Sequence, residues 1–101
     1  SLFDYPKQQT ESFTISLLSE QIYTFYKSGR NSATIRICNI LFAIDPLSDM
    51  AMTYAVCTYR RQSRSDKAIQ LYGTFTKEYR KVMDEDYPIT FDDVSTDNIR
   101  L

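Results

Sequence analysis

The 101-residue sequence contains no histidine and no tryptophan, and it has only two glycines, two cysteines and three prolines. Without histidine the chain lacks the commonest general base, which excludes serine–histidine and cysteine–histidine catalytic pairs. The two glycines, Gly29 and Gly73, are isolated, so no glycine-rich phosphate-binding loop is present. We therefore expect a protein that is not an enzyme and that uses no cofactor.

Metal-binding patterns are also missing. Cys38 and Cys57 stand in apolar stretches far apart in the sequence, whereas a structural zinc site usually takes four cysteine or histidine ligands. The acidic runs at residues 84–86 and 92–93 lack the alternating oxygen ligands and the turn glycine of a calcium-binding loop. We interpret the acidic runs as solvated loop charge and the cysteines as buried, reduced thiols. The sequence predicts no metal site and a cytoplasmic location.

The overall charge and hydropathy exclude two further classes of partner. A formal net charge of -1 argues against a general polyanion binder and against a polybasic membrane surface. No apolar run approaches the roughly 18 residues that span a bilayer, so we expect no membrane contact. Because the chain opens on Ser1 rather than methionine, we expect a piece of a larger protein.

The pattern of apolar residues predicts an all-α fold. Residues 11–28 carry Ile15, Leu18 and Ile22 at the three- and four-residue spacing of an amphipathic helix. The same spacing predicts helices at residues 32–43, 46–62 and 66–83, followed by an acidic tail at residues 84–101. Apolar tail residues such as Tyr87 and Val94 are expected to dock the tail on the last helix, and Thr90 with Asp93 resembles a short capping box.

Short polar breaks separate the predicted helices. Gly29 suits the left-handed position that ends a helix. Asn31 or Ser32 is expected to cap the second helix, and Ser63 or Ser65 the fourth, because their side-chain oxygens accept hydrogen bonds from free main-chain N–H groups.

The dipeptide Asp45-Pro46 divides two apolar runs. Proline disfavours helical geometry in the residue before it but tolerates the first helical position, so we expect Asp45 to cap the third helix and Pro46 to begin it. Gly73 falls inside the fourth helix at a cost of about 1 kcal/mol relative to alanine. A close approach of another part of the backbone would explain that glycine.

The helices repeat. Four pairs of similar residues are each separated by 34 positions: Arg30 and Arg64, Ile35 and Ile69, Ile37 and Leu71, Leu41 and Phe75. A 34-residue period is that of the tetratricopeptide repeat, which has two antiparallel helices in each unit. The sequence therefore predicts one domain with a first repeat at about residues 12–45, a second at 46–83 and a tail at 84–101. A plain four-helix bundle is the alternative.

A more specific resemblance lies in the order of motifs across residues 13–94. The chain resembles the bacterial transcriptional activation domain, whose pattern is Asp-Pro-Leu, an acidic residue, an apolar helix, a basic break, an alanine-containing helix with a tyrosine, and an extended tail with proline. These elements are Asp45-Pro46-Leu47, Asp49, residues 50–59, residues 60–64, Lys67-Ala68-Ile69, Tyr72 and Tyr87-Pro88. Ser63 stands where that family often has glycine. The resemblance implies a regulatory and assembly module of a transcription regulator, with DNA contacted only through a separate domain.

A partner-binding surface is expected on the first helix of each pair, because those helices line the concave face of a tetratricopeptide array. The candidate residues there are Tyr23, Tyr26, Lys27, Thr53, Arg60 and Arg61. Arginine offers a two-pronged fork for carboxylates, so the basic end is expected to bind an acidic peptide segment or a chain terminus. The alternative is that Arg60, Arg61 and Arg64 only keep a turn soluble and complement a helix C-terminus.

Three functions remain after this reading of the sequence. The first is a non-enzymatic protein–protein interaction module of a bacterial transcription regulator, with self-association as one form of partner. The second is a general tetratricopeptide adaptor with no role in transcription. The third is direct DNA binding, against which the acidic tail and the slightly negative charge argue.

Overall fold

The structure is a computed structural model that describes residues 4–99, with side chains from Thr10 onward. The elements are α1 (Asp4–Lys27), α2 (Asn31–Ile44), α3 (Asp49–Arg61), α4 (Ser65–Met83) and the short 3-10 helices η1 (Phe91–Asp93) and η2 (Thr96–Asn98). Residues 4–99 contain no strand, so the predicted all-α class with four helices is confirmed.

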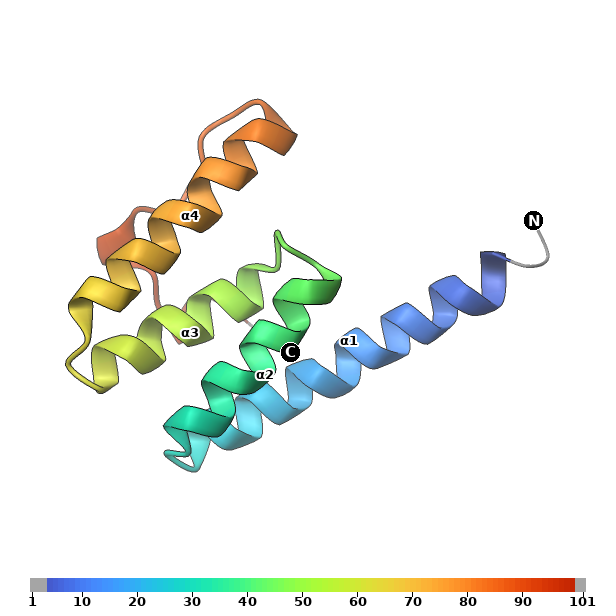
Figure 1. The fold of residues 1–101 in the computed structure, drawn as a ribbon, viewed down its shortest axis with the longest axis horizontal. Helices are drawn as coiled ribbons and strands as arrows, with labels where there is room; N and C mark the ends of the chain where they lie inside the picture. The colour runs from blue at the N-terminus through green and yellow to red at the C-terminus, as the bar shows by residue number, and fades with distance from the viewer. Residues whose placement is uncertain (1–3, 100–101) are drawn as a thin grey trace.

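The helices pack in sequence order. The contacts are α1 with α2, α2 with α3, and α3 with α4, and α1 also contacts α3. The chain turns back between α1 and α2 and again between α3 and α4, and the N-terminal part of α1 extends beyond the other helices (Figure 1). This arrangement makes α3 the central helix of the molecule.

Helix α1 ends in the glycine turn that the sequence predicts. Gly29 has φ +74° and donates its N–H to the carbonyl of Tyr26 at 3.1 Å, and Arg30 donates to Phe25 at 2.9 Å. These two hydrogen bonds define a Schellman motif, which satisfies carbonyls that a helix end leaves free. The Arg30 guanidinium also lies 5.0 Å from the centre of the Phe25 ring.

Helix α3 ends in the same motif 34 residues later, but with serine at the left-handed position. Ser63 has φ +59° and donates to Arg60 at 2.9 Å, while Arg64 donates to Tyr59 at 2.8 Å and lies 5.5 Å from the centre of its ring. The two turns therefore match residue for residue. In this match Tyr26 corresponds to Arg60 and Phe25 to Tyr59.

The caps predicted for α2 and α4 are wrong. Arg30 and Arg64 occupy the N-cap positions, and neither makes a side-chain capping hydrogen bond. The Schellman motif leaves a single residue before the next helix, so Asn31 and Ser65 are already the first helical residues of α2 and α4.

The start of α3 also differs from the prediction, because the helix begins at Asp49 and not at Pro46. Asp45 does not cap the helix: its carboxylate accepts the main-chain N–H of Leu47 at 3.1 Å, and its carbonyl accepts that of Ser48 at 3.1 Å. Ser48 is the cap, with a hydroxyl oxygen that accepts a main-chain N–H three residues further on at 3.1 Å. The Asp-Pro pair forms a tight turn, and proline preset for such a turn does not also start the helix.

Two clusters of buried side chains hold the fold together. The first joins α1, α2 and α3 around Ile22, Leu41 and Tyr54. The second joins α3, α4 and the tail around residues that include Phe75 and Val94, so the expected docking of the tail on the last helix is confirmed. No helix that the structure describes is long and apolar enough to cross a membrane.

Two expectations for α4 are wrong. A Cβ atom added at Gly73 would have no heavy atom within 4 Å apart from its own helix and chain neighbours, so no other backbone passes close to it. Ile69, expected on the core face, is 56% exposed. Gly73 and Ile69 both lie in the predicted helix, but on a side of α4 against which no other described helix packs.

Candidate functional site: the tyrosine face of α1 and α3

Because α1 contacts α3, the structure brings the two predicted stripes of partner-binding residues side by side. On α1, Tyr23 is 40% exposed, and the exposed Lys27 ammonium lies 5.5 Å from the centre of its ring. Tyr26 is half-buried and meets Tyr54 of α3 edge to face, with ring centres 5.0 Å apart. Tyr23, Tyr26 and Cys57, with the buried Tyr54 (3% exposed) beneath them, form a region that we call the tyrosine face.

Arg61 borders the tyrosine face and joins α3 to the first turn. Its guanidinium lies 3.9 Å from the centre of the Tyr26 ring and donates to the Tyr26 carbonyl at 2.9 Å. It also donates to the side-chain oxygen of Asn31 at 2.9 Å. Arg61 is nevertheless exposed, so it supplies positive charge at the edge of the face.

Thr53 lies beneath the surface, with 3% of its area exposed. The reason is that α3 contacts α1, α2, α4 and η2, which together cover most of its circumference. In this arrangement Thr53 presents no group to a partner.

The sequence analysis missed Tyr54, which is central to the face. A signal was present, because Met50, Tyr54, Cys57 and Arg61 follow one another at three- and four-residue spacing along one side of α3.

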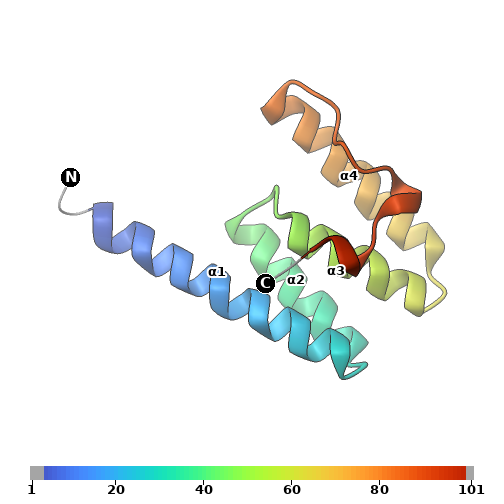
Figure 2. The same ribbon diagram turned by 180° about the vertical axis from the view of Figure 1, so that it is seen from behind.

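Arg60 differs from the other candidates because it holds the C-terminal segment, residues 84–99. Its guanidinium donates to the carbonyl of Val94 at 2.8 Å and to that of Phe91, and it lies 4.3 Å from the centre of the Phe91 ring. Figure 2 shows this red segment passing in front of α4 and then of α3. The sequence predicts that this basic end binds an acidic peptide segment or a chain terminus, and here Arg60 binds a segment of its own chain.

Aromatic residues fix the first part of the C-terminal segment. The Tyr87 ring meets Phe75 and Tyr79 of α4 edge to face at 5.0 and 5.1 Å. Burial raises the pKa of Tyr87, and the nearby Asp49 carboxylate raises it further. The Tyr72 hydroxyl donates to the carbonyl of Ile89. Asp49, one of the motif residues, thus lies beside the tail.

The capping box expected at Thr90 and Asp93 is wrong. Thr90 precedes η1, but its side chain makes no capping hydrogen bond. The side chain that caps a short helix in this region is that of Ser95, whose hydroxyl oxygen accepts the N–H of Asp97 at 3.2 Å and begins η2.

The second part of the segment reaches the tyrosine face. Burial raises the pKa of the Cys57 thiol, while the Arg60 guanidinium and a hydrogen bond from the Thr96 main chain act to lower it. Burial likewise raises the pKa of Tyr26 and Tyr54, and the negative charge of Asp97 adds to both shifts. Because η2 contacts α3, the second part of the segment lies against the face, with the Thr96 main chain beside Cys57.

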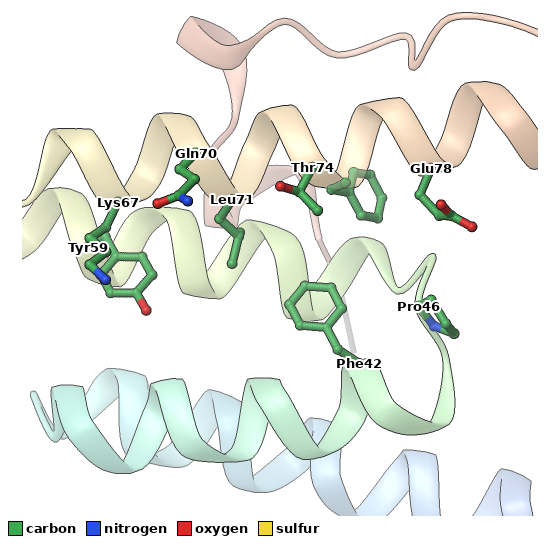
Figure 3. Close-up of a pocket in the computed structure, with 9 residues that line it drawn as sticks. Phe42, Pro46, Tyr59, Lys67, Gln70, Leu71, Thr74 and Glu78 are labelled. Atoms are coloured by element: carbon green, nitrogen blue, oxygen red, sulfur yellow. The ribbon is translucent and has the colours of Figure 1, made fainter.

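A second hollow lies between α2 and α4, with a volume of about 450 Å³ (Figure 3). Phe42, Tyr59, Leu71 and Phe75 supply its apolar lining. Its charged and amide side chains all come from one side of α4: Lys67, Gln70 and Glu78. None of the predicted partner-binding residues lines this hollow.

Within residues 4–99 no three cysteine or acidic side chains gather closely enough to hold a metal ion. Comparisons with protein-family models, with curated proteins and with solved structures give no match. The resemblance to the bacterial transcriptional activation domain therefore stays a prediction. What the geometry defines is a tyrosine-rich, basic-edged surface with a polypeptide segment lying on it.

Proposed function

We propose that this chain is a non-enzymatic protein–protein interaction module of a bacterial transcription regulator, and that it binds a partner polypeptide on the tyrosine face. In this proposal the module is cytoplasmic and has a tetratricopeptide-like architecture. DNA is contacted only by a separate domain of the regulator.

The observation that carries the proposal is that this surface already holds a polypeptide segment, the part of the tail that contains η2. Exposed aromatic and arginine side chains are the residues most enriched at the energetic centres of protein interfaces. Tyr23, Tyr26 and Arg61 provide both kinds within one small area, and Lys27 adds charge.

The tetratricopeptide-like architecture is supported by two features. Equivalent Schellman turns at Gly29 and Ser63 are separated by the 34-residue period of that repeat. Each helix contacts the next, and the first helix of one pair contacts the first helix of the other, as expected when helix pairs stack on their neighbours.

The role in transcription has separate support, namely the order of motifs from Asp45-Pro46-Leu47 to Tyr87-Pro88. The contact between Tyr87 and Asp49 is consistent with that order, because it gives two of these motifs a shared structural task. A general adaptor without a role in transcription is the second candidate, because the features of the tyrosine face bear on peptide binding alone.

A reporter assay separates the two candidates. The chain is fused to a DNA-binding domain that does not activate transcription, with its operator placed beside a reporter promoter in bacterial cells. We expect reporter expression to change relative to the DNA-binding domain alone. The double variant Tyr23→Ala/Lys27→Glu should abolish the change, because loss of an aromatic anchor costs an interface about 2 kcal/mol, or roughly thirtyfold in affinity.

The matched control is Ile69→Ala/Lys77→Glu on α4, which likewise removes a large exposed side chain and reverses a lysine charge, but away from the tyrosine face. This control should retain the effect on the reporter provided that it stays folded, which circular dichroism checks. A fusion with no effect on the reporter would contradict the role in transcription, and an effect that survives Tyr23→Ala/Lys27→Glu would contradict the assignment of the face.

A further inference from the structure

The C-terminal segment consists of two parts that are held in different ways. Residues 87–94 belong to the second core cluster: Val94 is 4% exposed, and Arg60 binds the carbonyls of Phe91 and Val94. This first part covers the apolar side of α3 and α4. Removing it from α3 and α4 would expose the core, so it is a permanent part of the fold.

The second part, residues 95–99, lies over the tyrosine face and is held less firmly. Asp97 and Asn98 are exposed, and Ile99 is half-buried against the first core cluster. The side-chain hydrogen bonds of Ser95 and Asn98 stay within the segment, since Ser95 accepts from Asp97 and Asn98 donates to the Asp93 carbonyl. Its contact with the helices therefore consists of the Ile99 side chain, the Thr96 main chain beside Cys57 and the Asp97 charge.

Opposite charges and an apolar contact lie at this part of the segment. The Arg61 guanidinium lies over the Tyr26 ring, and the negative charge of Asp97 raises the pKa of the same tyrosine, which Arg61 acts to lower. Ile99, an aliphatic residue two positions after Asp97, packs against the first core cluster.

We infer that residues 95–99 occupy the binding site of the tyrosine face in place of a partner, and that the partner is a short polypeptide segment with an acidic residue two positions before an aliphatic one. This inference rests on the proposed function of the face and adds to it the kind of partner and its regulation. Partner binding displaces residues 95–99 only, while Arg60 keeps residues 87–94 in place.

Competition between the resident segment and an external peptide sets how much the affinity for that peptide is reduced. A short tethered segment has an effective concentration of about 1 mM at its own site. If the free segment binds with a Kd of about 0.1 mM, occupancy in the same chain weakens the binding of an external peptide about tenfold. A variant whose own segment no longer binds the face should therefore bind the external peptide about tenfold more tightly.

The experiment uses a fluorescent, end-capped synthetic peptide with the sequence of residues 93–99, Asp-Val-Ser-Thr-Asp-Asn-Ile, added to the full chain. Its polarisation is measured with the unchanged chain and with Asp97→Asn/Ile99→Ser, which removes the charge and the aliphatic anchor of the resident segment. The matched control is Asp92→Asn/Ile69→Ser, which makes the same two changes at exposed positions away from the face. Thermal unfolding verifies that each chain is folded, and Asp97→Asn alone serves if the double variant is not.

We expect the peptide to bind the Asp97→Asn/Ile99→Ser chain about tenfold more tightly than it binds the unchanged chain or the control. Equal binding to all three chains would overturn the inference, because the resident segment would then not compete. Absence of binding to the opened variant would overturn it as well. Tight peptide binding together with a silent reporter would leave this inference intact and remove only the role in transcription.

Discussion

The two helix pairs share the same turn between their helices but differ in what surrounds them. Both have a first helix that ends in a Schellman turn, with an arginine stacked on the ring of an aromatic residue five positions earlier. In the first pair the residue three positions before the left-handed residue is Tyr26, which packs against Tyr54 in the tyrosine face. In the second pair that position is Arg60, which binds the C-terminal segment.

Different parts of the C-terminal segment cover the two pairs. Residues 87–94 cover the apolar side of the second pair, and Ile99 packs against the core of the first. Both pairs keep large apolar side chains in contact with solvent, among them Phe13 at 66% exposure in the first and Val82 at 60% in the second. The repeat therefore builds the helices and turns, and residues outside the repeat decide which surfaces stay accessible.

The largest expected effect comes from removing the arginine that distinguishes the pairs. Arg60→Ala removes two charge-assisted hydrogen bonds and a stacked ring, so the free energy of unfolding should fall by about 2 kcal/mol. Arg64→Ala removes only an exposed arginine–ring contact worth about 0.5 kcal/mol. Urea denaturation of both variants measures the difference. Equal losses for the two variants would mean that Arg60 does not hold the C-terminal segment.

A smaller effect is expected from exchanging the left-handed residues of the two turns. Ser63→Gly should stabilise the fold by about 1 kcal/mol, because a residue with a Cβ atom pays that cost in the left-handed region. Gly29→Ser should destabilise it by about the same amount, because a Cβ atom at Gly29 meets nothing within 4 Å and only the backbone conformation matters. The chain with both changes should unfold at nearly the original temperature. A loss of stability in Ser63→Gly would show that the serine side chain contributes to the turn.

The smallest effects are expected from alanine substitutions in the middle of the second helix of each pair. Gly73→Ala in α4 should raise the free energy of unfolding by just under 1 kcal/mol, because the glycine has no packing role. The equivalent position in α2 is Asn39, which is exposed, and Asn39→Ala should give about half that gain. Thermal unfolding of each variant measures both values. A destabilising Gly73→Ala would indicate a neighbour that the helix packs against.

Much of the fold could be predicted from local patterns. Apolar spacing predicts four helices, and the last three lie within three residues of their observed bounds, whereas α1 begins seven residues before its predicted start. Gly29 indicates the first turn because left-handed geometry favours glycine. The caps could not be predicted, because Ser63 adopts a conformation that serine rarely takes and so leaves no room for a separate capping residue. The predicted start of α3 was wrong because an aspartate side chain can either cap a helix or stabilise a turn. The Asp45 carboxylate accepts the main-chain N–H of Leu47 and so stabilises the turn.

The candidate site was less accessible to prediction. Arg60 and Arg61 are adjacent and chemically identical, yet one holds the tail and the other borders the tyrosine face. The different roles of Arg60 and Arg61 depend on the path of residues 84–99, and the sequence of that segment has little of the periodicity that predicts structure. Thr53 is buried because four elements surround α3, and a helical pattern read along one helix does not report how many neighbours that helix has.

The measurement that tests the account most directly is the rate at which iodoacetamide alkylates Cys57 at pH 8, with the buried Cys38 as an internal reference. In the unchanged chain residues 95–99 lie on Cys57, and burial raises the pKa of its thiol, which lowers the fraction of reactive thiolate. Releasing the segment in Asp97→Asn/Ile99→Ser removes both part of that burial and the Thr96 hydrogen bond, which act on the pKa in opposite directions, so the rate should rise because the thiol becomes accessible to the reagent.

We predict that Cys57 reacts about tenfold faster in this variant than in the unchanged chain, which corresponds to about 1.4 kcal/mol of local protection. Cys38, whose pKa is raised by burial to about 12, should stay slow in both chains. Equal Cys57 rates in the two chains would contradict the claim that residues 95–99 cover the tyrosine face.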